Sequence, residues 1–290
     1  MRRVGAIASL IFAGLLLAGA ARAADRYFMT SDGVRLHYTE AGRGRTVVMV
    51  PGWTMPAWIF EAQIRAFSQT YRVVAFDPRS QGDSEVADTG HDPWRRGQDI
   101  GELIDRLGPD PVLLVGWSLG VLDSLAYVHE HGDRHVAGLV LVDNSVGEDP
   151  APSASGAGSA RPARRGAKLP KLSRPEEMRR FVDGMFLRPQ PRPWLERLTE
   201  ACLRTPPAAA SALRSYPVPR SFWKEAVYST DHPVLYVVRP TWAGQAFNLA
   251  NHHPNAESVV MEGVGHALFV DDPGRFDRVV EAFIHRRVWP

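Results

Sequence analysis

The sequence contains a single cysteine, Cys202, among its 290 residues. One cysteine excludes an intramolecular disulfide framework and any metal cluster held by several cysteines. Strong charge of either sign is also lacking, since 34 Lys and Arg face 32 Asp and Glu for a formal net charge of +2. Such a balance indicates neither nucleic acid nor an acidic polymer as a partner. We therefore expect no metal, no cofactor and no nucleic acid, and a chain that is 44% hydrophobic can bury a substantial core.

A long apolar run occurs at the N-terminus, where two arginines precede residues Val4 to about Ala20. Ala21-Arg22-Ala23 then places small residues at the two positions that determine cleavage of a signal peptide. We predict a Sec signal peptide over residues 1–23, cut after Ala23, and a mature protein that is periplasmic or secreted. An uncleaved anchor is the alternative because the run approaches the length of a short membrane span. The small-residue ending favours cleavage, which leaves no stable membrane anchor.

Short apolar runs recur along the rest of the chain and alternate with segments compatible with helices. An N-terminal pair, 26–30 and 34–39, flanks Ser31-Asp32-Gly33 and predicts a β-hairpin. Runs without polar alternation are typical of strands buried on both faces of a parallel sheet. Further strands are predicted at 46–50, 72–76, 112–115, 136–142, 233–238 and 258–261, and helices at 58–68, 93–107, 121–131, 241–251 and 273–286. This alternation predicts an α/β fold with a mainly parallel sheet, in which ligands bind at the carboxyl ends of the strands.

The alternation breaks between about Gly147 and His232, where no buried strand is predicted. Residues 150–170 are rich in Pro, Ala, Ser, Gly and Arg, a composition typical of a surface loop. Ser173-Arg174-Pro175-Glu176 matches a capping box and precedes amphipathic helical runs. We expect a core formed by 24–147 and 232–290, and a helical lid or cap formed by 148–231. A buttress that serves only stability is the alternative.

The chemistry of the chain is predicted from the pentapeptide Gly116-Trp117-Ser118-Leu119-Gly120, which follows a buried strand and precedes a helix. This strand–turn–helix context is the one that a nucleophile elbow requires. The two glycines lack the β-carbons that would collide where strand and helix approach each other. The turn lifts the Ser118 hydroxyl clear of the sheet and leaves the Leu119 amide at a helix N-terminus, where it can donate to an anion. The context favours a catalytic serine over a chance match to a common pattern.

A serine hydroxyl needs a base within hydrogen-bond reach, and the chain offers ten histidines. Most of them fall at helix ends or on predicted surface segments. His266 differs because it follows a predicted strand, in the loop Glu262-Gly263-Val264-Gly265-His266, and lies C-terminal to the serine. We interpret His266 as the general base.

Four segments together resemble the α/β-hydrolase fold superfamily in its lid-bearing, single-domain form, from about Tyr27 to Val288. They are the serine pentapeptide, the Pro51-Gly52-Trp53 turn, the segment Asp77-Pro78-Arg79-Ser80-Gln81-Gly82-Asp83-Ser84 and the His266 loop. The resemblance implies a mainly parallel sheet of eight strands with a helical lid inserted after strand 6. It also implies Ser118 as nucleophile, His266 as base, and the amides of Trp53 and Leu119 as an oxyanion hole.

The sequence departs from the family pattern in three places. A proline, Pro51, stands where the oxyanion turn usually has histidine, and Ser80 replaces a usual glycine. Neither change removes an oxyanion donor, because those donors belong to the main chain. The third departure is the absence of a carboxylate from residues 239–245, the loop in which the family usually carries its triad acid.

The candidate acid is therefore Asp143, which follows the preceding predicted strand and keeps the order serine, acid, histidine. Some families of this fold carry the acid at that strand end. The alternative is that Asp143 only hydrogen-bonds its own loop. Asp231 and Glu262 are the fallback acids.

These roles predict a carboxylesterase or short-chain lipase that acts through an acyl-enzyme intermediate. Lactonase, perhydrolase, amidase and C–C bond hydrolase remain open because they share the three residues, and a non-catalytic ligand-binding protein is a second class of alternative. A serine at the elbow argues against dehalogenase and epoxide hydrolase chemistry, which this family performs with a carboxylate nucleophile. Tryptophans near predicted strand ends, among them Trp117 and Trp242, indicate a pocket for a small apolar ester. For Trp242 the alternative is simple packing of a helix onto the sheet.

Overall fold

The computed structural model describes residues 23–149, 172–215 and 217–290. Except for Ala23, the predicted signal peptide lies outside the described residues, as does the predicted surface loop at 150–170. Within the described ranges, no helix is both long enough and apolar enough to cross a membrane.

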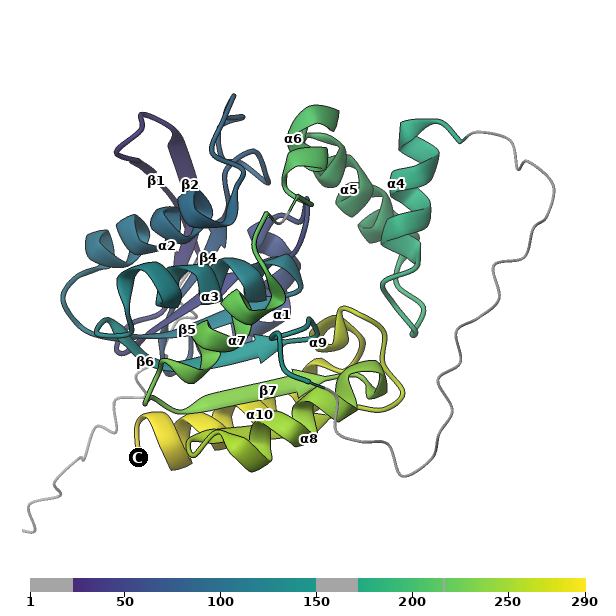
Figure 1. The fold of residues 1–290 in the computed structure, drawn as a ribbon. Coiled ribbons are helices and arrows are strands. Elements are labelled where there is room, and N and C mark those ends of the chain that lie inside the picture. The colour runs from purple at the N-terminus through teal and green to yellow at the C-terminus, as the bar shows by residue number, and fades with distance from the viewer. Residues whose placement is uncertain (1–22, 150–171, 216) are drawn as a thin grey trace, which may run out of the picture.

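A single sheet of eight strands runs through the molecule, in the order β1-β2-β4-β3-β5-β6-β7-β8 (Figure 1). The hairpin strands β1 and β2 are antiparallel to each other, and β2 is antiparallel to β4, while every other neighbouring pair is parallel. The strands are β1 (Ala24–Met29), β2 (Arg35–Ala41), β3 (Thr46–Val50), β4 (Arg72–Asp77), β5 (Val112–Trp117), β6 (Val136–Val142), β7 (Val234–Val238) and β8 (Ala256–Val260). The predicted fold class, an eight-stranded and mainly parallel α/β sheet, is confirmed.

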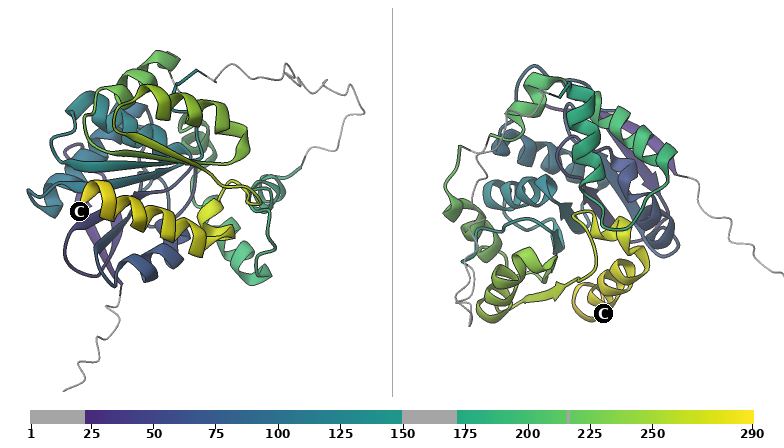
Figure 2. Two further views of the ribbon diagram at one scale, coloured as in Figure 1. Left: turned by 90° about the horizontal axis from the view of Figure 1, so that it is seen from below. Right: turned by 90° about the vertical axis from the view of Figure 1, so that its right-hand side faces the viewer.

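Helices cover both faces of this sheet (Figure 2). Buried side chains of α2, α3, α7 and α8 share one apolar core with the sheet, and those of α1, α9 and α10 share the other. The helical segments are η1 (Ala57–Phe60), α1 (Glu61–Phe67), α2 (Pro93–Leu107), α3 (Leu119–His131), α4 (Arg174–Asp183), α5 (Arg192–Leu203), α6 (Pro207–Ala212), α7 (Arg220–Tyr228), η2 (Pro240–Trp242), α8 (Ala243–His252), α9 (Leu268–Asp271), α10 (Pro273–Phe283) and η3 (Ile284–Val288).

The central strands form buried elements because their side chains are apolar on both faces. In β3, Val48 and Val50 belong to one core, and Val47 and Met49 belong to the other. Burying a Val, Leu or Ile side chain is worth about 1.5–3 kcal/mol, and this double layer places such residues on both sides of the backbone. The continuous apolar runs of the sequence therefore identified these strands.

The helices between β6 and β7 do not form a single unit. Helices α4, α5 and α6 gather in the upper right of Figure 1, near the carboxyl ends of the strands. The predicted capping box of α4, formed by Ser173 and Glu176, is present. Helix α7, by contrast, packs on α3, and its Phe222, Trp223 and Val227 are buried in the core of the sheet. It lies within the range predicted as a lid, yet it contributes to the layer of helices on the sheet.

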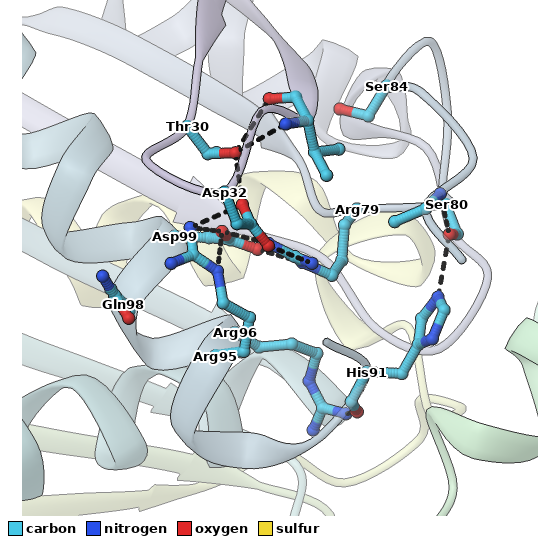
Figure 3. A network of polar contacts seen from close by, with 12 residues as sticks. Thr30, Asp32, Arg79, Ser80, Ser84, His91, Arg95, Arg96, Gln98 and Asp99 are labelled. Atoms are coloured by element: carbon cyan, nitrogen blue, oxygen red, sulfur yellow. Dashed lines mark hydrogen bonds and ion pairs between the residues drawn. The ribbon is translucent and has the colours of Figure 1, made fainter. Parts of the chain in front are cut away.

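A buried polar network joins the β1–β2 hairpin to α2 and to the loop after β4 (Figure 3). At its centre, Arg79 is fully buried and bonds both oxygens of Asp99, with Nε–Oδ2 at 2.6 Å and Nη2–Oδ1 at 2.7 Å. Asp32 of the hairpin turn accepts hydrogen bonds from the same guanidinium. Arg95, one turn before Asp99 in α2, donates to the Asp99 carboxylate. A bidentate arginine–carboxylate pair is geometrically specific, so this network fixes the hairpin against α2.

Ser80, which stands where the resembling family usually has glycine, lies at the edge of this network. Its φ of 63° is the left-handed conformation that glycine adopts most easily. Its hydroxyl oxygen lies 2.9 Å from His91 Nε2 and accepts a hydrogen bond from the Ala87 amide. These bonds hold a serine in a backbone conformation that would otherwise favour glycine.

Candidate active site

The strand ends bring the site together because neighbouring parallel strands finish level with each other. Trp117 pairs with Val142, and Val142 pairs with Val237. The ladder continues one residue further, since the Ser118 amide donates to Val142 O at 2.9 Å and the Asp143 amide donates to Val237 O at 3.0 Å. Residues that directly follow β5, β6 and β7 therefore lie side by side.

Ser118 occupies the sharp turn between β5 and α3. Its φ of 55° and ψ of −118° are unusual for any residue with a side chain, as a nucleophile elbow requires. The two flanking glycines leave no room for a β-carbon. One added to Gly116 would lie 2.3 Å from Gly120 O, and one added to Gly120 would lie 2.2 Å from Val50 O.

His266 links Ser118 to Asp143. Its Nε2 lies 2.8 Å from Ser118 Oγ, and its Nδ1 lies 2.6 Å from Asp143 Oδ2. With the proton on Nδ1 donated to the carboxylate, Nε2 is free to accept the serine proton. The structure thus brings together Ser118, His266 and Asp143, the three residues that the sequence analysis proposed as a triad.

Asp143 reaches His266 from a turn with φ of 53°, and its side chain is completely buried. Besides His266, it accepts hydrogen bonds from the amide of Arg239 at 2.9 Å and from the Arg239 guanidinium Nε at 2.6 Å. The fallback acids take no part in this array: Asp231 and Glu262 are both exposed, and Asp143 alone bonds His266 Nδ1 among the carboxylates of the described residues.

Arg239 is the site residue whose role sequence reasoning missed. It appeared there only as the first residue of a loop without a carboxylate. The available signal was its position directly after β7, where the family usually places residues of the site. Arg239 follows β7, and Asp143 follows the neighbouring strand β6. The candidate acid of this chain therefore lies one strand away from the position that the family usually uses.

The loop that carries His266 is held by residues from β5 and from helices on either side. Trp117 Nε1 donates to His266 O at 2.9 Å. Asp271 of α9 accepts the Gly265 amide at 2.6 Å and also the Leu187 amide at 2.7 Å, so it ties the histidine loop to the segment after α4. The sequence analysis missed both α9 and this role of Asp271, because a four-residue helix has no detectable periodicity.

Two predicted pocket residues do not line the cavity beside the site. Trp117 is only 1% exposed and packs under His266 against Phe60 and Phe269, so it supports the catalytic loop. Trp242 packs against the apolar core of the sheet, which was the alternative reading. The prediction failed for both because a tryptophan near a strand end can point into the core as readily as into a pocket.

A cavity of about 430 Å³ has Trp53 in its wall, and none of Ser118, His266 and Asp143 lines it. Trp53 Nε1 donates to Ala210 O of α6 at 2.7 Å, and its ring meets Phe181 of α4 edge-on at 4.9 Å. The remaining lining residues are mixed, three of them apolar, three charged and one a serine: Met178, Pro207, Ala210, Arg174, Glu177, Arg214 and Ser211. The cavity therefore lies between the loop after β3 and helices α4 and α6.

The backbone segments that carry Trp53 and Leu119 both adjoin Ser118. Gly52 packs so closely on the serine that an added β-carbon would lie 2.9 Å from Ser118 Cβ. The next residue, Thr54, has φ of 61°, and Gln81 Oε1 accepts its amide hydrogen. Leu119 is the first residue of α3, so its amide has no partner within the helix. Both predicted oxyanion donors belong to backbone segments fixed beside the serine.

One other cluster of potential ligands stands apart from this site. His37, Asp77 and Asp83 place ligand atoms within 4.8 Å of one another, as a metal site would. Asp77, however, already accepts hydrogen bonds from His37 Nδ1 at 2.7 Å and from the amides of Ala57 and Asp83. Burial lowers the pKa of His37, but the hydrogen bond to Asp77 and the negative charges of Asp77, Asp83 and Asp25 together raise this pKa above its ordinary value. The cluster anchors two loops to β2 by hydrogen bonds.

Comparison with known proteins identifies the family. A model of the alpha/beta hydrolase family matches residues 47–279. The chain belongs to this family. Its curated relatives include a soluble epoxide hydrolase of Corynebacterium sp. (strain C12), 32% identical over 38% of this chain and 38% of that protein. A non-heme haloperoxidase of Rhodococcus erythropolis is 32% identical over 40% of this chain and 43% of that protein. The chain thus spans about two fifths of the length of the curated relatives it matches.

Solved structures match over most of the chain. The esterase RhEst1 from Rhodococcus sp. ECU1013 is 26% identical, with a TM-score of 0.73 over 91% of this chain and 99% of that one. The family has members with different chemistries, so the reaction has to be argued from the residues of this site.

Proposed function

We propose that this protein is a serine hydrolase that cleaves carboxylic esters through an acyl-enzyme intermediate. The observation that carries the proposal is the continuous hydrogen-bonded array from Ser118 Oγ through His266 to the buried carboxylate of Asp143. Nucleophile, base and orienting acid are in the geometry that activates a serine at neutral pH.

In the first half of the reaction, Ser118 Oγ attacks the ester carbonyl while His266 Nε2 takes the hydroxyl proton. The carbonyl oxygen becomes an oxyanion, which the amides of Trp53 and Leu119 stabilise. Such preorganised donors are each worth a factor of about 10²–10³ in kcat in serine hydrolases. The imidazolium then gives its proton to the departing alcohol, and Asp143 stabilises the positive charge on the ring throughout.

In the second half, water attacks the acyl-enzyme, and the same groups act again. His266 takes a proton from the water, and the oxyanion forms at the same two amides. Collapse of the intermediate releases the carboxylic acid and returns the proton to Ser118. Every step uses residues that the structure brings together.

The cavity beside Trp53 supports an apolar ester as the substrate. Trp53, Met178 and Phe181 offer apolar surface directly next to a proposed oxyanion donor. A volume of about 430 Å³ falls in the range of small-molecule sites. We propose that one side of the ester, acyl or alcohol, lies in this cavity, with α4 and α6 as its cover.

Other reactions on the same array remain competing proposals. Lactonase, perhydrolase, amidase and C–C bond hydrolase chemistry would use the same nucleophile and base. The relative named as an epoxide hydrolase matches only two fifths of its length, and Ser118 stands at the elbow where that chemistry uses a carboxylate. A non-catalytic ligand-binding protein is the alternative of a different class.

The deciding experiment combines turnover of p-nitrophenyl butyrate with labelling by a serine-directed fluorophosphonate. We expect the parent protein to do both and Ser118→Ala to do neither, because the hydroxyl that His266 contacts is then gone. Ser124→Ala is the matched control, since Ser124 lies on the same helix and bonds Gly120 O instead of a histidine.

Three outcomes would contradict the proposal, and each points to a different class of protein or a different nucleophile. A parent protein that takes no label is a binding protein, and labelling that survives Ser118→Ala places the nucleophile elsewhere. A parent that takes the label but leaves nitrophenyl esters intact points to one of the other reactions on this array.

A further inference from the structure

Arg239 makes the triad of this protein unusual, because a cation lies against both the acid and the base. Its Nε donates to Asp143 Oδ2 at 2.6 Å, the same oxygen that lies 2.6 Å from His266 Nδ1. Its Nη2 lies 3.4 Å from that imidazole nitrogen. The guanidinium and the imidazole therefore compete for a single carboxylate oxygen, Asp143 Oδ2.

The surroundings of this contact strengthen its electrostatic effect. Asp143 is completely buried, while the side chains of Arg239 and His266 are 30% and 24% exposed. The other groups that face His266 are the Ser118 hydroxyl and the ring of Trp117, and Asp271 reaches the loop through the Gly265 amide. Among the residues that the structure describes, Arg239 alone brings a permanent positive charge to the imidazole.

We propose that Arg239 is a positioning residue that sets the protonation state of His266, by sharing Asp143 with the imidazole and by disfavouring the imidazolium. A positive charge next to a histidine opposes its second proton, whereas an aspartate alone favours it. The kinetic part of this inference rests on the proposed serine hydrolase function, but the titration of His266 does not.

Arg239 also bears on which nitrogen of His266 carries the proton. When Nδ1–H donates to Asp143, Nε2 can accept from Ser118. In the opposite tautomer, Nδ1 would accept from Arg239 Nη2, and Nε2 would no longer be a base. The backbone amide of Arg239 and its Nε pin Asp143 on the side of Nδ1, which holds the carboxylate where it selects the productive tautomer.

The test is the titration of His266 by NMR in protein labelled with 15N-histidine, with the signal assigned from a His266→Gln sample. Arg239→Gln removes the charge, so we expect the midpoint of the His266 titration to move up by about one pH unit. Arg239→Lys keeps the charge and should bring the midpoint back to within about 0.3 unit of the parent. Arg188→Gln is the matched control, because Arg188 bonds Asp272 beside the same loop without touching His266.

Kinetics supply the second readout. The acidic limb of the pH profile of kcat/KM should shift by the same amount as the NMR midpoint in Arg239→Gln, while the plateau above that limb falls less than tenfold. A purely structural role would lower activity at every pH without moving the limb. An unchanged midpoint in Arg239→Gln, or one that Arg239→Lys fails to restore, overturns the proposal.

A second variant keeps the test decisive if Arg239→Gln does not fold. Asp143→Asn leaves the guanidinium in place and removes the charge that opposes it, in a side chain of equal size. The His266 midpoint should then fall below that of the parent, because the guanidinium charge is no longer opposed by a carboxylate. A midpoint at or above that of the parent contradicts the electrostatic role of Arg239. A parent protein that shows these His266 titration differences but no ester turnover would instead count against the proposed function alone.

Discussion

Asp99 and Asp143 are two of the buried carboxylates that arginine holds in this protein, and only Asp143 lies against a histidine and a serine. Asp99 receives both arms of Arg79, and neither side chain of this pair is more than 1% exposed (Figure 3). Asp143 accepts hydrogen bonds from Nε and the backbone amide of Arg239. The Nη2 of the same arginine lies 3.4 Å from His266 Nδ1. The Asp99 cluster is closed, because arginines occupy its carboxylate. The Asp143 cluster is open, because its carboxylate also bonds the His266 imidazole, which contacts Ser118.

The difference shows what makes a carboxylate structural or catalytic. Arg95 also donates two hydrogen bonds to Asp99 Oδ1, so the negative charge of Asp99 is neutralised by arginines within the fold. Asp143 Oδ2, by contrast, is shared between the Arg239 guanidinium and the His266 imidazole, and the side chain of His266 is 24% exposed. A closed pair contributes rigidity, whereas an open one can stabilise positive charge on the imidazole that it bonds.

The largest effect should come from neutralising the open carboxylate. Asp143→Asn should lower kcat for p-nitrophenyl butyrate by a factor of about 10³–10⁴, because the amide no longer selects the productive tautomer of His266. Steady-state kinetics on the folded variant give the value. Asp83→Asn serves as the control, since Asp83 pairs with Arg204 at the surface, and it should stay within about twofold of the parent. A loss below tenfold in Asp143→Asn would place the acid elsewhere.

Breaking the closed cluster should affect stability instead of chemistry. Arg79→Met leaves Asp99 buried beside an apolar side chain, and removing one partner of a buried pair costs about 3–5 kcal/mol of unfolding free energy. Urea unfolding measures this loss, while kcat of the folded fraction should change less than threefold.

The surface pair Arg204–Asp83 provides the matched comparison for Arg79→Met. Its side chains are about half exposed, so Arg204→Met should cost no more than about 1 kcal/mol. Equal losses in the two variants would mean that burial of the Arg79–Asp99 pair has no special effect on stability.

The smallest effect concerns a third carboxylate, Asp277 of α10, which forms no ion pair within the described part of the chain. Burial raises its pKa to about 6, although it accepts a hydrogen bond from Gln63. Because the folded protein holds this proton more tightly than the unfolded chain, stability falls as pH rises from about 4 through about 6. Asp277→Asn removes this dependence and keeps the bond acceptor for Gln63.

The measurement is the unfolding free energy of parent and Asp277→Asn at pH 4 and pH 7.5. We expect near equality at pH 4 and a gain of about 1–2 kcal/mol for the variant at pH 7.5, after allowance for partial exposure of the group. A variant that is less stable than the parent at pH 7.5 would show that the carboxylate has a compensating partner.

Much of the fold could be predicted because its strands have apolar side chains on both faces. The range predicted for β6, Val136–Val142, is the range observed, and that for α2, Pro93–Leu107, also agrees. Short or mixed elements were missed. Helix α7 is nine residues long, and its buried residues Phe222, Trp223, Ala226 and Val227 span too few turns to give a clear helical period.

For the site, the nucleophile and the base could be located from local patterns, because a tight turn and a strand-end loop leave clear sequence signals. Asp143 was selected because residues 239–245 lack a carboxylate, and because it follows a predicted strand and keeps the order serine, acid, histidine. The sequence could not show where the two tryptophan side chains point, since Trp117 and Trp242 differ from pocket residues only in their orientation.

The sequence by itself determined the order of strands and helices, the strained serine turn and the identity of the candidate base. Backbone conformation and apolar burial follow from neighbouring residues, and these are written locally in the chain. Only the tertiary structure decided that Arg239 shares the carboxylate of Asp143 with His266, because these residues are 96 and 123 positions from Asp143. Three strand ends meet at one edge of the sheet, and that meeting exists only after the strands have paired.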